Sequence, residues 1–98
     1  MPVGDWYMPD VIADILRDRG QQYGDYALQA DVAQRLKEVM YTAAGEQERT
    51  LTSVQWESLD MIATKISRII CGDADKWDTW ADIAGYAKLV ADRIPTKG

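Results

Sequence analysis

The chain has 98 residues and a formal net charge of −5, with 47% apolar and 28% charged residues, a composition typical of one folded globular domain. The acidic balance argues against generic binding of duplex DNA, which needs a basic surface to displace counterions. Histidine is absent and Cys71 is the single cysteine, so the sequence excludes an intramolecular disulfide and the common zinc sites.

The sequence contains no apolar run near the ~20 residues that a membrane-spanning helix needs, and its beginning lacks the pattern of a signal peptide. We therefore expect a cytoplasmic protein with no membrane association. A domain of this size buries only about 60–65% of its unfolded surface, which leaves its stability marginal. We expect a homo-oligomer for that reason.

Helical spacing of apolar residues predicts four helices after a short N-terminal arm at residues 1–8. The clearest helix start is Thr52, because Gln55 three residues later completes a capping-box pattern. A glycine follows each of the first three predicted helices, and Pro95 follows the fourth. No segment alternates with period two, so the expected fold is an all-α, four-helix bundle-like single domain over residues 9–95. The predicted helices span residues 9–19, 25–44, 53–71 and 78–94.

Charged residues of the third predicted helix lie opposite its apolar arc. They are not spaced as a ladder of ion pairs, since Lys65 lies five residues after Asp60 and Arg68 has no acidic residue three or four positions before it. We therefore expect these charges to face another helix or a ligand.

The fourth predicted helix carries Asp82, Gly85, Tyr86 and Leu89 on the side opposite its apolar arc. A glycine in the middle of a helix costs about 1 kcal/mol relative to alanine, and a solvated face has no use for it. We expect this second face to be covered, either by a packed helix or subunit or by a ligand.

A glycine-rich turn at residues 20–25 is flanked by Arg19, Tyr23 and Asp25. It is not a phosphate-binding loop, because it lacks the Gly-Lys-Ser/Thr end and a preceding strand. Trp80 and Tyr86 could stack on a nucleotide base, although in a chain without phenylalanine such residues also fill the core.

Residues 19–25, 51–69, 72–73 and 80–90 together resemble a family of small phage and prophage proteins with no settled function. The resemblance covers most of residues 10–94. It implies a phage or prophage origin, and with it the cytoplasm of an infected or lysogenic bacterial host.

A more distant resemblance is to the MazG-like all-α nucleoside triphosphate pyrophosphohydrolases, helical bundles whose acidic residues hold Mg²⁺ against a triphosphate. The pair Glu57 and Asp60 resembles their Glu-x-x-Asp element, and Asp78 and Asp82 would supply acids from the next helix. The double-glutamate element of that family is absent.

Three functions follow as hypotheses, with binding ranked first. The first is binding of a nucleotide, or of a nucleotide-derived signal of host defence such as a cyclic nucleotide, between the last two helices at a subunit interface. The second is Mg²⁺-dependent hydrolysis of a nucleoside triphosphate with release of pyrophosphate, and the third is inhibition of a host protein. The first hypothesis assigns no catalytic residue and no certain cofactor. Its ligand-binding residues are Arg19, Tyr23, Lys65, Arg68, Trp80, Asp82 and Tyr86. The second would use Glu57, Asp60, Asp78 and Asp82 in catalysis, with Glu57, Asp60 and Asp82 as metal ligands.

Overall fold

The computed structural model describes residues 9–96, so the arm predicted at residues 1–8 lies outside the described part of the chain. Within that range the chain forms four helices and no strand. The predicted all-α, bundle-like fold is thereby confirmed. The helices are α2 (Pro9–Tyr23), α3 (Tyr26–Glu46), α4 (Ser53–Cys71) and α5 (Trp77–Ala91).

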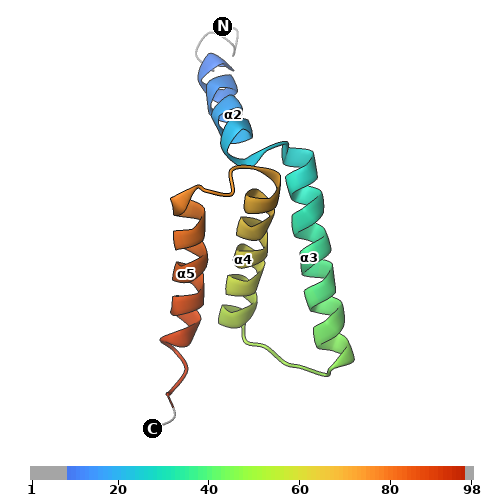
Figure 1. Cartoon of the computed structure of the whole chain (residues 1–98). Helices are drawn as coiled ribbons and strands as arrows, with labels where there is room; N and C mark the ends of the chain where they lie inside the picture. The colour runs from blue at the N-terminus through green and yellow to red at the C-terminus, as the bar shows by residue number, and fades with distance from the viewer. Residues whose placement is uncertain (1–8, 97–98) are drawn as a thin grey trace, which may run out of the picture.

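Helix α4 is the centre of the fold. Figure 1 shows α3 and α5 lying on opposite sides of α4, so that the three form a layer, while α2 extends beyond one end of it. Small residues let α3 and α4 approach closely: Ala33, Ala63 and Ser67 are all buried. The Ser67 hydroxyl is satisfied by donating to the Thr64 carbonyl at 2.6 Å.

The first two helices run further than predicted. Gly20 lies inside α2, which continues to Tyr23, and α3 continues through Gly45 to Glu46. The residue that ends α2 is Gly24, which has a left-handed φ of +82° and donates its N–H to the Gly20 carbonyl at 2.9 Å. The prediction that Gly20 ends the first helix was wrong, because Gly20 stays within the helix and the left-handed backbone turn falls at Gly24.

The last helix is shorter than predicted and ends at Ala91 rather than Ile94. The Arg93 and Ile94 amides donate to carbonyls only three residues back, at 2.9 and 3.2 Å. The backbone after Ala91 therefore has the hydrogen-bond pattern of a 3₁₀ turn rather than of an α-helix. Pro95 explains this change, because a proline disfavours helical geometry in the residue before it.

The start of α4 matches the prediction fully. Thr52 accepts a hydrogen bond from the Gln55 amide at 3.1 Å, and the Gln55 side chain accepts one from the Thr52 amide at 2.9 Å. We expect Thr52→Ala to lower the free energy of unfolding by about 1 kcal/mol, the usual effect of losing such a cap. Urea denaturation checks this, with the exposed neighbour Ser53→Ala as control. Equal effects of the two substitutions would contradict a capping role.

Apolar burial within the chain is small. Among residues 10–96 the buried apolar side chains are Ala33 and Ala63, whereas many larger ones remain exposed. On α4, Ile70 lies in the apolar arc that helical periodicity predicts, yet it is 69% exposed. The arc itself was predicted correctly, but a layer of three helices covers only the two flanks of its central helix.

Candidate functional site

The turn between α2 and α3 packs directly against the turn between α4 and α5. A Cβ atom on Gly24 would lie 1.9 Å from the Cys71 carbonyl oxygen, and one on Gly72 would lie 2.4 Å from backbone atoms of Tyr23. The Asp73 amide also donates to the Gln22 carbonyl at 2.8 Å. We call Tyr23, Gly24, Cys71 and Gly72 the glycine crossing. It fixes the end of α2 against the end of α4.

The glycine crossing holds the Tyr23 ring beside three cationic side chains. The Arg68 guanidinium carbon lies 4.7 Å from the ring centre, the Arg19 guanidinium carbon 6.0 Å and the Lys76 Nζ 5.9 Å. These distances are within the range of cation–π attraction. Gln29, which is buried, donates from Nε2 to the Tyr23 carbonyl at 3.4 Å and so ties α3 to the same point.

A cavity of about 470 Å³ opens beside this cluster, and we call it the cationic cavity. Asp25 also lines it, but its Oδ2 accepts a hydrogen bond from the Leu28 amide at 3.1 Å and caps α3. A volume of this size is typical of sites for small molecules. The complete lining comprises Leu16, Arg19, Gly20, Tyr23, Gly24, Asp25, Tyr26, Gln29 and Arg68.

Arg68 is the least compensated charge of the cavity. Its Nε is buried and has no hydrogen-bond partner among the described residues. Within residues 10–96 no carboxylate lies at ion-pair distance from Arg68 or Arg19. A partly buried guanidinium without an acceptor is unfavourable, so an anion entering the cavity would relieve that cost.

The other predicted ligand-binding residues lie elsewhere. Lys65 Nζ forms an ion pair with Asp82 Oδ2 at 3.0 Å and thereby joins α4 to α5, with the Lys65 side chain only 12% exposed. Trp80 donates from Nε1 to the Ala74 carbonyl at 2.8 Å. Tyr86 lines a separate cavity of about 430 Å³ with Asp82, Gly85 and Leu89. The seven residues predicted as one site therefore divide between separate places.

Three of the four carboxylates of the hydrolase hypothesis are engaged with separate partners within the chain. Asp60 accepts a hydrogen bond from the Tyr41 hydroxyl at 2.6 Å, Asp78 pairs with Lys76 at 3.2 Å, and Asp82 pairs with Lys65. Glu57 lines a groove beside α5. The described residues contain no group of three or more acidic, cysteine or histidine side chains that could hold a metal ion.

Tyr41 was not anticipated from the sequence. Its hydrogen bond to Asp60 raises the pKa of the Tyr41 hydroxyl, and partial desolvation and the charges of Asp60 and Glu57 act in the same direction. Its ring also contacts Trp56 edge-on, with the ring centres 5.1 Å apart.

Lys76 was missed as well, because only the approach of the two turns brings residue 76 to residue 23.

The fold and this cavity together define an all-helical domain with a tyrosine-centred cationic cavity. The chain belongs to the family DUF6378, a domain of unknown function, whose model matches residues 10–94. Comparison with curated proteins and with solved structures found no match. Within the described residues no helix has the length and apolar character to cross a membrane.

Proposed function

We propose that this protein binds a small phosphorylated ligand of the nucleotide class in the cationic cavity. The observation that carries the proposal is Arg68, a guanidinium held against Tyr23 with a buried, unbonded Nε and no paired carboxylate. Arg19 adds a second uncompensated charge from α2. Two arginines suit a phosphate because each offers a planar fork of donors to its oxygens.

The aromatic residues of the cavity provide the second half of a nucleotide site. Tyr26 is 78% exposed at the start of α3 and lines the cavity together with Tyr23. A base can stack on either ring at a gain of about 1–3 kcal/mol, while the phosphate contacts the arginines. The sequence-based hypothesis put the site between α4 and α5, whereas this proposal puts it at the junction of α2, α3 and α4.

The biological setting of this proposal rests on the sequence resemblance alone. For a phage-type accessory protein, the ligand would be a nucleotide or a cyclic nucleotide signal of host defence. Mg²⁺-dependent hydrolysis of a nucleoside triphosphate with release of pyrophosphate has less support, because Asp60, Asp78 and Asp82 each have a different partner within the chain. No described feature favours inhibition of a host protein over ligand binding.

Isothermal titration calorimetry tests the proposal with ATP, AMP and a cyclic dinucleotide. Adenosine is the matched control, because it offers the base and ribose without phosphate. We expect saturable binding of at least one phosphorylated compound with a Kd of about 1–100 µM, and no comparable binding of adenosine. Equal binding of adenosine and AMP, or no heat with any compound, would contradict the proposal.

A further inference from the structure

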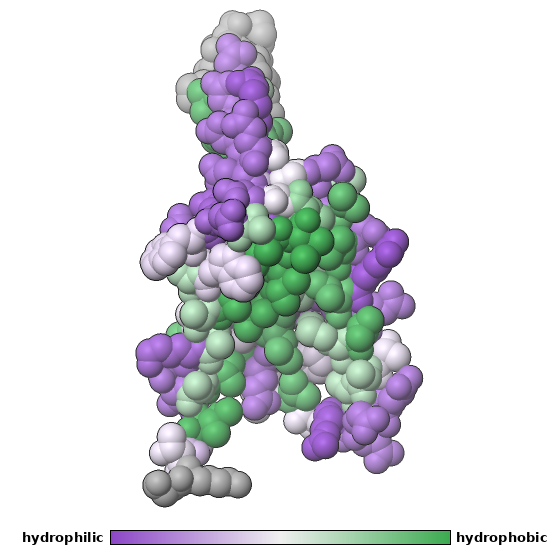
Figure 2. Space-filling model, viewed as in Figure 1, coloured by the Kyte–Doolittle hydropathy of each residue, from purple (hydrophilic) through white to green (hydrophobic). Residues whose placement is uncertain are grey.

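Helices α3, α4 and α5 each direct an apolar stripe to the same side of the layer. On α4, Leu59, Ile62, Ile66 and Ile70 fall within about 80° on a helical wheel. The corresponding stripes are Leu28, Val32, Leu36, Val39 and Ala43 on α3, and Trp80, Ile83, Ala87, Val90 and Ile94 on and just after α5. We call these three stripes the apolar face. Figure 2 shows a continuous apolar region over α4 between its two neighbours.

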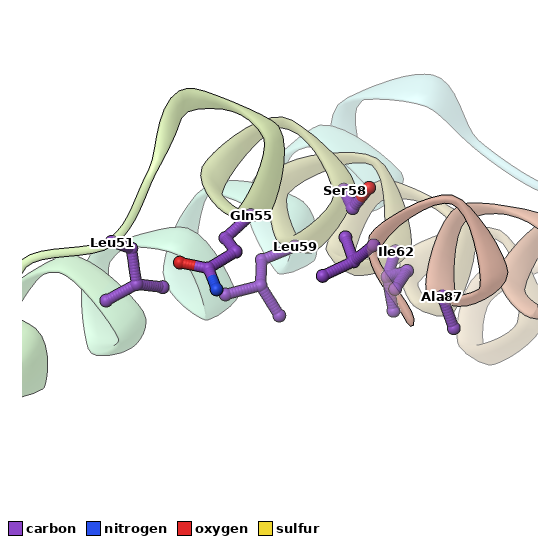
Figure 3. A pocket seen from close by; sticks show the side chains of 7 residues that line it. Leu51, Gln55, Ser58, Leu59, Ile62 and Ala87 are labelled. Atoms are coloured by element: carbon purple, nitrogen blue, oxygen red, sulfur yellow. The ribbon is translucent and has the colours of Figure 1, made fainter. Parts of the chain in front are cut away.

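The apolar face is open within the protomer. Leu28, Val39, Ile70, Trp80 and Ile94 are each more than half exposed. Between α4 and α5 it is hollowed into a cavity of about 370 Å³. Figure 3 shows the side chains of Leu51, Leu59 and Ala87 extending from the ribbons toward the same side of this cavity.

The exposed area is too large for a compact monomer. A compact monomer of 11.0 kDa exposes about 5,600 Å². This chain exposes 7510 Å². The surplus is roughly 1,900 Å², to which the exposed helix α2 also contributes. Each subunit of an obligate homodimer buries about 1,000–2,500 Å², so covering the apolar face would remove an area of that order.

We infer that the apolar face binds the apolar face of a second copy, giving a two-layer homodimer whose core lies between the layers. Within residues 10–96 the protomer's own buried apolar side chains are two alanines, which cannot form the core of an independent domain. Within the arcs of the three stripes the one charged residue is Glu46 at the end of α3, so the face offers little that would select a charged partner. Two identical apolar surfaces related by a two-fold axis can cover each other, and such an interface needs no additional charged or polar contacts to select its partner.

This interface is distinct from the surface that the sequence singled out. Leu89 lies about 180° from Trp80 around α5, on the same side as Asp82 and Gly85. The dimer therefore leaves the Asp82–Gly85 surface free. Arg68 is also about 160° from Ile66 around α4, so the cationic cavity opens away from the partner.

Sedimentation equilibrium of the full chain tests the inference through a matched pair of variants. Ile70→Glu places a charge on the apolar face at a position 69% exposed in the protomer, whereas Leu89→Glu places it on the opposite side at a position 48% exposed. We expect a wild-type mass of twice 11.0 kDa. The dimer dissociation constant should rise at least about 30-fold in Ile70→Glu and less than about threefold in Leu89→Glu.

Thermal unfolding of the wild type at several protein concentrations gives a second measurement that does not depend on any variant. We expect its Tm to rise with concentration, as mass action requires for a dimer that is the folded unit. A monomeric mass with a concentration-independent Tm would overturn the inference. A dimer that dissociates in Leu89→Glu but persists in Ile70→Glu would overturn it too, since the partner would then occupy the opposite side.

Discussion

Gly24→Ala and Gly72→Ala should each lower the free energy of unfolding by about 3 kcal/mol or more, the largest stability loss expected from any single methyl addition in this chain. At Gly24 a side chain would have to adopt the left-handed φ of +82°, which alone costs about 1–2 kcal/mol. At both positions the new Cβ would also overlap backbone atoms of the facing turn, which cannot move aside as a flexible side chain can.

Thermal denaturation measures this effect, with Gly45→Ala as the matched control. Gly45 lies inside α3, and a Cβ there would meet no atom within 4 Å, so alanine should raise the stability by about 0.5–1 kcal/mol. For a domain of this size a loss of 3 kcal/mol corresponds to a fall in Tm of at least about 10 °C. If the three variants have the same Tm, the glycine crossing does not fix α2 against α4.

Arg68→Met should weaken binding of the phosphorylated ligand about 10- to 100-fold. Methionine preserves much of the apolar stem of Arg68 but removes the charged guanidinium that lies over the Tyr23 ring, and a hydrogen bond to a charged group contributes about 1.5–3 kcal/mol. Arg68→Lys should give an intermediate loss, because lysine retains the charge without the planar fork of donors. Calorimetry with the ligand identified in the wild-type titration measures both variants.

Two controls show whether the effect belongs to the cationic cavity. Arg35→Met removes one positive charge from the exposed pair with Asp31 on α3, and binding should change less than about twofold. Lys65→Met removes a residue that the sequence suggested as a ligand-binding residue but that pairs with Asp82. If Lys65→Met abolishes binding and Arg68→Met does not, the ligand lies between α4 and α5 instead.

Local signals in the sequence predicted the fold well. The start of α4 was predicted correctly because Thr52 and Gln55 form a capping box from residues three apart. The end of α2 was misplaced because it depends on a contact between Gly24 and Cys71, which are far apart in sequence. Helical periodicity identified which face of each helix is apolar, but it carries no information on whether the same chain or a second copy covers that face.

The candidate site was predicted only in part for the same reason. The sequence drew attention to Arg19, Tyr23 and Arg68, and the fold brings them together. It could not exclude Lys65 from the group, because the ion pair with Asp82 forms only when α4 and α5 pack side by side. Lys76 gave no signal at all, since its position in a turn has no periodicity that would relate it to Tyr23.

Amide hydrogen exchange with and without the bound phosphorylated ligand tests the central claim most directly, because it reports where the ligand binds. We predict slower exchange in residues 19–29 and 68–76, which line or adjoin the cationic cavity, and unchanged exchange in residues 82–91 of α5. Slower exchange confined to residues 82–91, with no change at residues 19–29, would contradict the assignment of the site.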